Sequence, residues 1–151
     1  MALLVSLVFL LLLTLIGISS MQNATLQEKM SGSVKLRNES FQIAEAAARM
    51  GESAVQANDY KLATCTKCAP PPEAASVLVP GANSTSGVIW FAATDIAGGF
   101  WAVQKIATTK DPVNVNFVGE DESNSWTLYR ITGVGVSGNS RTVVESIYAK
   151  R

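Results

Sequence analysis

An uncharged apolar run at the N-terminus constrains this chain more than any other feature of its sequence. Residues 2–18 include thirteen large apolar side chains, eight of them leucine, and the first charged side chain is Glu28. Drawn as an α-helix, the first twenty residues would be roughly 30 Å long, which matches the hydrocarbon core of a bilayer. The thirteen side chains together favour membrane insertion by roughly 6 kcal/mol. The sequence therefore predicts a helix that can cross a membrane.

Other origins of such a run fit the flanking residues less well. A cleaved secretory signal would need a basic segment ahead of the apolar run, and none is present here. A plain single-span anchor would normally carry flanking basic residues, whereas the first one is Lys29. A buried core helix, apolar on all sides, is too large for a globule of about ninety residues. We expect instead that a charged leader has been removed ahead of Met1.

Helical spacing of apolar residues continues beyond this run. We expect one helix from Met1 to about Asn58, because the apolar positions recur every three, four or seven residues and residues 44–50 are rich in alanine. Its first part, residues 1–25, would be the membrane or filament-core half, and residues 26–58 an amphipathic half. The side chains expected to pack on the rest of the protein are Leu26, Met30, Val34, Phe41, Ala44 and Ala48.

Residues 59–151 are predicted to form a small β-sheet domain. Four runs are rich in β-branched and aromatic residues and are bounded by turn residues, namely 87–94, 99–108, 125–136 and 141–149. A tight turn between the last two would place Gly138 and Asn139 at positive φ. Since one antiparallel sheet of about four strands needs a cover for its apolar face, we predict an α+β fold in which the second half of the helix covers it.

Composition excludes several classes of function. The chain has no histidine, and its twelve basic and twelve acidic residues form no basic stripe. Nucleic-acid binding is therefore not expected. Enzymatic activity, a bound cofactor and a metal centre are not expected either. An acidic loop at Glu120, Asp121 and Glu122 is interpreted as a solvated turn, with a calcium site as the alternative. The aromatic residues of the strands are interpreted as core, unless two or more are exposed together.

Two cysteines, Cys65 and Cys68, lie three positions apart between the helix and the strands. In an oxidising compartment we expect them to form a local disulfide that fixes this connection. A thioredoxin-like redox pair would require a helix starting at the first cysteine, but Ala-Pro-Pro-Pro follows the second. A zinc site would require two further ligands.

Three stretches resemble the PilX-type minor pilins of type IV pili. They are ALLVSLVFLLLLTLIGISSMQNATLQEKMSG, RNESFQIAEAAARMGE and YRITGVGVSGNSRTVVESIYAKR. The resemblance implies a pilin-like fold and cleavage of a leader that leaves Met1 as a methylated N-terminus. It also implies an inner-membrane anchor before polymerisation, a place in the surface pilus afterwards, and roles in adhesion and twitching motility. The implied partners are other pilins, other minor pilins and a tip adhesin.

By the same resemblance, the apolar side chains of the run would contact lipid and then sister helices. They are Leu3, Leu4, Val5, Leu7, Val8, Phe9, Leu10, Leu11, Leu12, Leu13, Leu15 and Ile16. Most pilins carry glutamate at the fifth mature position, where this chain has Val5. A subunit at the filament tip has no preceding amine to pair with, so we expect a priming or tip role. Alternatives are a stoichiometric pilus or pseudopilus subunit, or a single-span periplasmic adaptor or sensor.

Overall fold

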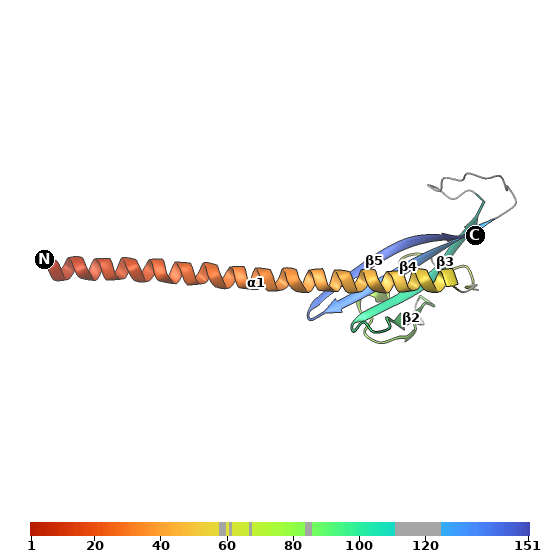
Figure 1. Cartoon of the computed structure of the whole chain (residues 1–151), viewed down its shortest axis with the longest axis horizontal. Coiled ribbons are helices and arrows are strands. Elements are labelled where there is room, and N and C mark those ends of the chain that lie inside the picture. Colours follow the sequence, from red (N-terminus) through yellow and green to blue (C-terminus); the bar gives the residue numbers. More distant parts are fainter. Residues whose placement is uncertain (58–59, 61, 67, 84–85, 111–124) are drawn as a thin grey trace. The chain divides into compact units, whose positions relative to one another are not determined.

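The computed structural model describes residues 1–57, 60, 62–66, 68–83, 86–110 and 125–151. The chain forms two compact units, residues 1–36 and residues 37–151. One helix, α1 (Ala2–Ala57), supplies the whole of the first unit and continues into the second (Figure 1). The unit boundary differs from the divisions that we expected at residues 25 and 58, because residues 37–57 of α1 pack within the second unit.

The second unit is built on a five-stranded antiparallel sheet in the order β1-β2-β3-β4-β5 (Figure 1). Its strands are β1 (Gly81–Ala82), β2 (Ile89–Ala92), β3 (Gly99–Thr109), β4 (Trp126–Ser137) and β5 (Ser140–Lys150), and a short 3₁₀ helix, η1 (Pro72–Ala75), precedes them. The predicted α+β class, with one long helix and an antiparallel sheet, is confirmed. The expected four strands match β2 to β5, whereas β1 is too short to give a sequence pattern.

A two-residue turn joins β4 to β5, since Ser137 pairs directly with Ser140. Gly138 has φ of +55°, as predicted. Among the described non-glycine residues, only Asp95 has a positive φ, so the same prediction for Asn139 was wrong. A hairpin turn with glycine at its first central position needs only that one positive φ, which explains the difference.

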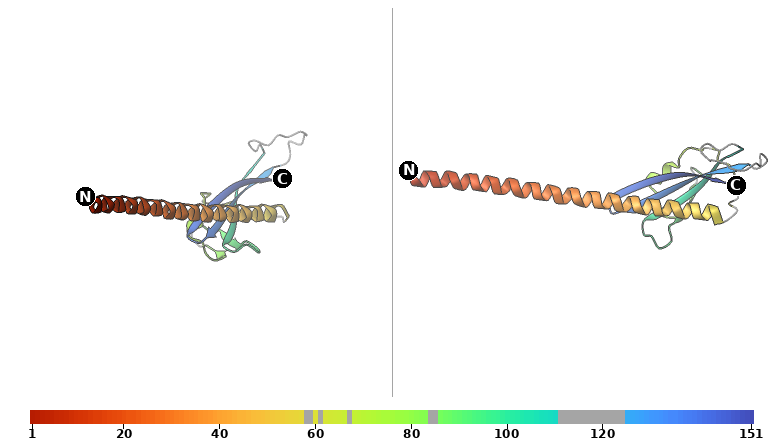
Figure 2. Two further views of the ribbon diagram at one scale, coloured as in Figure 1. Left: turned by 60° about the vertical axis from the view of Figure 1, so that its left-hand side comes forward. Right: turned by 45° about the horizontal axis from the view of Figure 1, so that its top comes forward.

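One face of the sheet is covered by α1, and small residues on both sides of the contact permit a close approach. The buried helix residues are Ser40, Ala44, Ala47, Ala48, Gly51 and Val55. Opposite them lie Gly133 and Gly135 of β4. A Cβ atom at Gly133 would overlap the backbone carbonyl oxygen of Ala44, and one at Gly135 would overlap that of Ser40. Figure 2 shows this part of α1 running along the strands in both views.

Two hydrophobic clusters lie on opposite faces of the sheet. On the helix side, Val55 of α1 packs with Ile131 of β4, and both are fully buried. On the other side, Val77, just after η1, packs with Trp90 of β2 and Val134 of β4. Because successive side chains of a strand point to opposite faces, β3 and β4 each contribute to both clusters. The sheet is therefore a central layer between α1 and the segment around η1.

The helix positions expected to pack on the sheet require a correction. Ala44 and Ala48 are buried as expected, with 0% and 4% of their surface exposed. Phe41, however, is half exposed, and Leu26, Met30 and Val34 are exposed residues of the first unit. Helical spacing identified an apolar face, but the backbone at Gly133 and Gly135 lies too close to the helix for large side chains. Contact with the sheet is made instead by the mostly small residues that begin at Ser40 and end at Val55.

Polar side chains join the helix to the last hairpin. Ser40 Oγ lies 2.8 Å from Thr142 Oγ1 and 3.1 Å from Ser140 Oγ. Ser137 Oγ donates to Glu39, and Lys150 Nζ donates to the carbonyl oxygen of Val55 at 2.7 Å. These hydrogen bonds fix the position of α1 along β5, which nonspecific apolar contacts would leave free to slide.

Two threonine-to-valine substitutions are expected to change stability in opposite directions. Thr132 is 1% exposed and its hydroxyl has no hydrogen-bond partner among the described residues, so Thr132→Val should stabilise the second unit by about 1 kcal/mol. Thr142→Val removes the hydrogen bond to Ser40 and should destabilise it by about 1 kcal/mol. Urea unfolding of the full chain in detergent, followed by tryptophan fluorescence, measures both. A loss of stability in Thr132→Val would show that its hydroxyl is satisfied after all.

Candidate functional site

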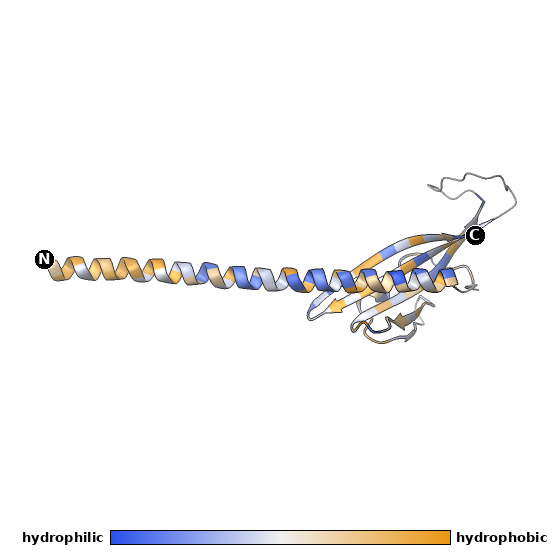
Figure 3. Ribbon diagram, in the orientation of Figure 1, coloured by the Kyte–Doolittle hydropathy of each residue, from blue (hydrophilic) through white to orange (hydrophobic). Residues whose placement is uncertain are grey.

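The first unit carries an apolar surface that nothing in the described chain covers. Every residue from Met1 to Lys35 is exposed, and Figure 3 shows the first turns of α1 coloured mostly as hydrophobic. Among the predicted filament-core residues, exposure runs from 52% at Leu12 to 85% at Leu3. All twelve lie on this surface. A soluble monomer rarely exposes so large a continuous apolar area, so this surface requires lipid or other apolar helices around it.

The polar side chains inside the apolar run satisfy themselves. Ser6 Oγ donates to the carbonyl oxygen of Leu3 at 2.9 Å, and Thr14 Oγ1 donates to that of Leu11 at 2.8 Å. An unsatisfied hydroxyl in hydrocarbon costs several kcal/mol, and these bonds within one turn of helix remove that cost. Neither hydroxyl of the run therefore needs water.

The length and composition of α1 are sufficient to cross a membrane, and none of its most apolar stretch is buried in the protein. That exposure argues against the core-helix interpretation. Charged side chains first appear at Glu28, so none lies inside a span of the first twenty residues. Val5 is 56% exposed and belongs to the same apolar surface.

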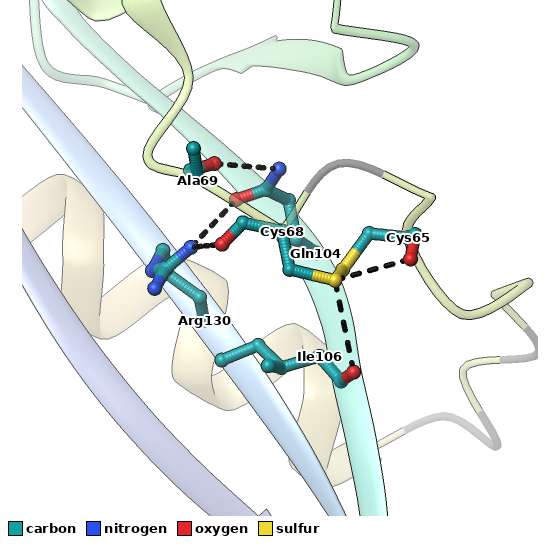
Figure 4. The surroundings of a disulfide bond; sticks show 6 residues. All are labelled: Cys65, Cys68, Ala69, Gln104, Ile106 and Arg130. Atoms are coloured by element: carbon teal, nitrogen blue, oxygen red, sulfur yellow. Dashed lines mark hydrogen bonds between the residues drawn. A yellow bond between two sulfur atoms is a disulfide. The ribbon is translucent and has the colours of Figure 1, made fainter.

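The predicted disulfide joins Cys65 and Cys68, whose Cα atoms are 5.3 Å apart. The backbone N–H of Cys65 donates to the carbonyl oxygen of Lys105 in β3 at 2.9 Å. Figure 4 shows Arg130 of β4 donating to the carbonyl oxygen of Cys68, and Gln104 of β3 donating to that of Ala69. The disulfide loop is thus hydrogen-bonded to both central strands.

Two further lines in Figure 4 run from Sγ of Cys68 to the carbonyl oxygens of Cys65 and Ile106, at 3.0 and 3.8 Å. A disulfide sulfur has no hydrogen to donate, so these are close contacts rather than hydrogen bonds. They show that the disulfide sulfur lies against β3. Neither Arg130 nor Gln104 was identified from the sequence, because a single polar residue inside a strand gives no sign of its partner.

Removing the disulfide is expected to have a local and moderate effect. Closing a loop of this length restricts the unfolded chain by about 2 kcal/mol, and the hydrogen bonds from Arg130 and Gln104 remain. Cys65→Ser/Cys68→Ser should therefore lower the unfolding free energy by about 2 kcal/mol without preventing folding. Urea unfolding of the wild type with and without dithiothreitol measures the change. The double variant is the control, since it should not respond to dithiothreitol.

The remaining predicted features contribute less to the candidate site than the apolar run and the disulfide. Glu120, Asp121 and Glu122, with the calcium site considered there, lie outside the described residues. Two aromatic side chains, Phe91 and Trp101, are stacked with ring centroids 4.5 Å apart, and both are partly exposed.

Burial raises the pKa of the Tyr60 hydroxyl above its ordinary value of 10.0. Because the unfolded chain would lose this proton first, the contribution of Tyr60 to stability is lost only at strongly alkaline pH.

Comparison with known proteins identifies the first third of the chain. Residues 1–49 match the family model described as PilX N-terminal. Searches of curated proteins and of solved structures found no match. The matched segment includes the whole exposed apolar run and the helix as far as Arg49, and the sheet lies outside it. Residues 1–49 are therefore similar to the N-terminal region of PilX proteins.

Proposed function

We propose that this protein is a minor pilin, a structural subunit of a type IV pilus rather than an enzyme. The observation that carries the proposal is the uncharged, fully exposed run of α1, in a segment that matches the PilX N-terminal model. Before assembly, this run would anchor the subunit in the bacterial inner membrane. After assembly, it would pack against the equivalent helices of other pilins in the filament, with the second unit exported.

Transfer from membrane to filament is energetically plausible for this helix. Both surroundings are apolar, so moving the leucine side chains between them changes the hydrophobic free energy little. Ser6 and Thr14 keep their hydrogen bonds within the helix in either place. Small side chains between leucines also allow neighbouring helices to approach closely. Association is then decided by shape and by the few polar groups present.

Within the filament, we place the subunit in a priming or tip complex. In most pilins a glutamate at position five is thought to pair with the N-terminal amine of a neighbouring subunit, and Val5 cannot do so. An unpaired carboxylate in apolar surroundings is costly, so its loss is favourable where no amine needs a partner. A subunit at the tip meets that condition. Its partners there would be other minor pilins and a tip adhesin.

Mass spectrometry of sheared surface filaments tests the proposed function. The expected result is this protein at a small fraction of the major subunit, with Met1 as a methylated N-terminus. A stoichiometric amount would replace the tip role with that of a main subunit. Recovery from the inner membrane only, with no trace in filaments, would contradict the pilin assignment and favour a membrane-anchored periplasmic adaptor or sensor.

A further inference from the structure

Strand β5 forms one edge of the sheet, and its outer side is open. Among the described strands its neighbour is β4 alone, and Figure 1 shows β5 as the outermost strand. It pairs with β4 over all eleven of its residues, from Ser140 to Lys150, without a bulge. Within the described part of the chain, no backbone hydrogen bond outside the β4–β5 ladder reaches residues 141–147. The edge is therefore long, regular and unpaired.

The hairpin register determines which backbone groups of β5 face outward. Ser137 and Ser140 flank the two-residue turn, and in such a hairpin the flanking pair is joined by backbone hydrogen bonds. Hydrogen-bonded pairs recur at every second residue, so the even-numbered residues of β5 face β4. The N–H and C=O groups of the odd-numbered residues in 141–147 point away from β4. These outward groups can pair with one more strand.

The features that usually prevent an edge strand from pairing further are missing from β5. It contains no proline and no bulge. Its charged side chains are directed to their own chain instead. Arg141 donates to the carbonyl oxygens of Ala74 and Val77, at 3.2 and 3.0 Å. Arg130 Nε lies 3.7 Å from Oε2 of Glu145. These charges hold β5 to its own sheet and leave the edge unprotected.

The outward-facing residues also place a row of exposed side chains beside the edge. Val143 and Ile147 are 42% and 58% exposed, and the side chain of Glu145 between them is 33% exposed. Because side chains alternate along a strand, these three share one face, while Thr142 contacts Ser40 of α1 on the other. An apolar, acidic, apolar row therefore accompanies the open edge.

A second copy of β5 fits this row poorly. Antiparallel pairing of two β5 strands over their full length would place Glu145 opposite Glu145, and like charges directly opposite are destabilising. Moving one strand by two residues places Glu145 opposite Val143 or Ile147 instead. A shift of four residues leaves only seven of the eleven paired, since 11 − 4 = 7. The opposite edge of the sheet, β1, is two residues long. The row therefore favours a different chain.

We propose that the β5 edge binds an extended segment of another protein, which joins the sheet as a further strand antiparallel to β5. The segment carries lysine or arginine opposite Glu145, and apolar side chains opposite Val143 and Ile147. The 3.7 Å contact with Arg130 is longer than a hydrogen bond, so the carboxylate can still accept from a partner's cation. This inference goes beyond the proposed function and concerns the second unit alone.

Hydrogen exchange of the ¹⁵N-labelled full chain in a phosphocholine detergent tests whether the edge is open. We expect the amides of the odd-numbered residues in 143–147 to exchange at least about tenfold faster than those of the even-numbered residues in 142–146, which bond to β4. Equal protection of the two sets would show that the edge is covered and would overturn the proposal.

A synthetic peptide, Thr-Ile-Thr-Lys-Thr-Val-Thr with both ends blocked, is the binding probe. It should shift the β5 amide resonances saturably, with a dissociation constant on the order of 0.1–1 mM. In the expected pairing, the N–H groups of its isoleucine, lysine and valine face β5. N-methylation of these three should abolish binding, whereas N-methylation of the last three threonines, whose N–H groups face solvent, should preserve it. Replacing the lysine with glutamate should weaken binding about tenfold.

Variants of β5 test the same contact from the protein side. Ile147→Pro removes an outward N–H without removing a β4 ladder bond, and it should abolish peptide binding. Ile147→Thr keeps that N–H and is the matched control, with binding weakened by no more than about fivefold. Glu145→Gln should remove the preference for the lysine peptide over the glutamate peptide. If Ile147→Pro fails to fold, the two N-methylated peptides decide.

Three results of the binding experiments would overturn the proposal. They are no saturable shift with the lysine peptide, equal binding of the two N-methylated peptides, and β5 shifts that depend on protein concentration without peptide. The second would reduce the site to a side-chain patch, and the third would make a second copy the occupant. None of these results bears on recovery of the protein from sheared filaments, so this proposal and the pilin assignment fail separately.

Discussion

Gly133→Val is expected to destabilise the second unit by at least about 3 kcal/mol and to lower its melting temperature by more than about 10 °C. A Cβ atom at this position would overlap the backbone carbonyl oxygen of Ala44 and lie 2.8 Å from the backbone nitrogen of Ala48. Because the overlap is with helix backbone, no shorter side chain on α1 can relieve it. The helix must move away from the sheet, which separates Val55 from Ile131. Valine otherwise favours strands, so the loss is not one of β-propensity.

Thermal unfolding of the full chain in detergent, followed by tryptophan fluorescence, measures this change. Thr132→Val is the matched control, since it introduces valine at the adjacent position of β4 on the opposite face. The account requires opposite signs for the two variants. A Gly133→Val protein as stable as the wild type would show that α1 does not lie this close to β4.

Leu10→Lys/Leu12→Lys is expected to release the protein from the membrane and to abolish its incorporation into filaments. Each substitution removes about 0.5 kcal/mol of favourable transfer and adds about 3 kcal/mol of cost, so the pair cancels the roughly 6 kcal/mol that favours insertion. The second unit should still fold, because Leu10 and Leu12 belong to the separate first unit. Carbonate-washed membranes and sheared filaments are the two fractions to measure.

Leu26→Lys/Met30→Lys is the matched control for this pair. Both side chains are exposed on the same helix, at 64% and 72%, but beyond the uncharged run. This variant should remain in the membrane fraction. If the Leu10/Leu12 variant behaved like its control, the apolar run would not be the anchor.

Much of this architecture was predictable because it depends on local patterns. Uninterrupted helical spacing predicted α1, and the β-branched and aromatic runs predicted β2 to β5 within one or two residues at most ends. The cysteine spacing predicted the disulfide. Each of these signals lies within a short window of sequence, which is why one sequence was sufficient.

The helix–sheet contact was less predictable because it depends on how closely two backbones approach. Leu26, Met30 and Val34 mark an apolar face, yet the contact is made by small residues opposite Gly133 and Gly135. Alternating glycines in a strand were the available signal, since a strand rarely loses two side chains on one face without a reason. The pairing of Arg130 with the disulfide loop depends on residues far apart in the sequence. No local pattern contains that information.

The central claim is that the apolar run lies in lipid before assembly and among sister helices afterwards. Photo-crosslinking from position 10, with a photoreactive phenylalanine analogue replacing Leu10, tests it most directly. The account predicts adducts with lipid in the inner membrane, and adducts with the N-terminal helix of another pilin in sheared filaments. Adducts with this protein's own sheet, or with soluble periplasmic proteins alone, would contradict it.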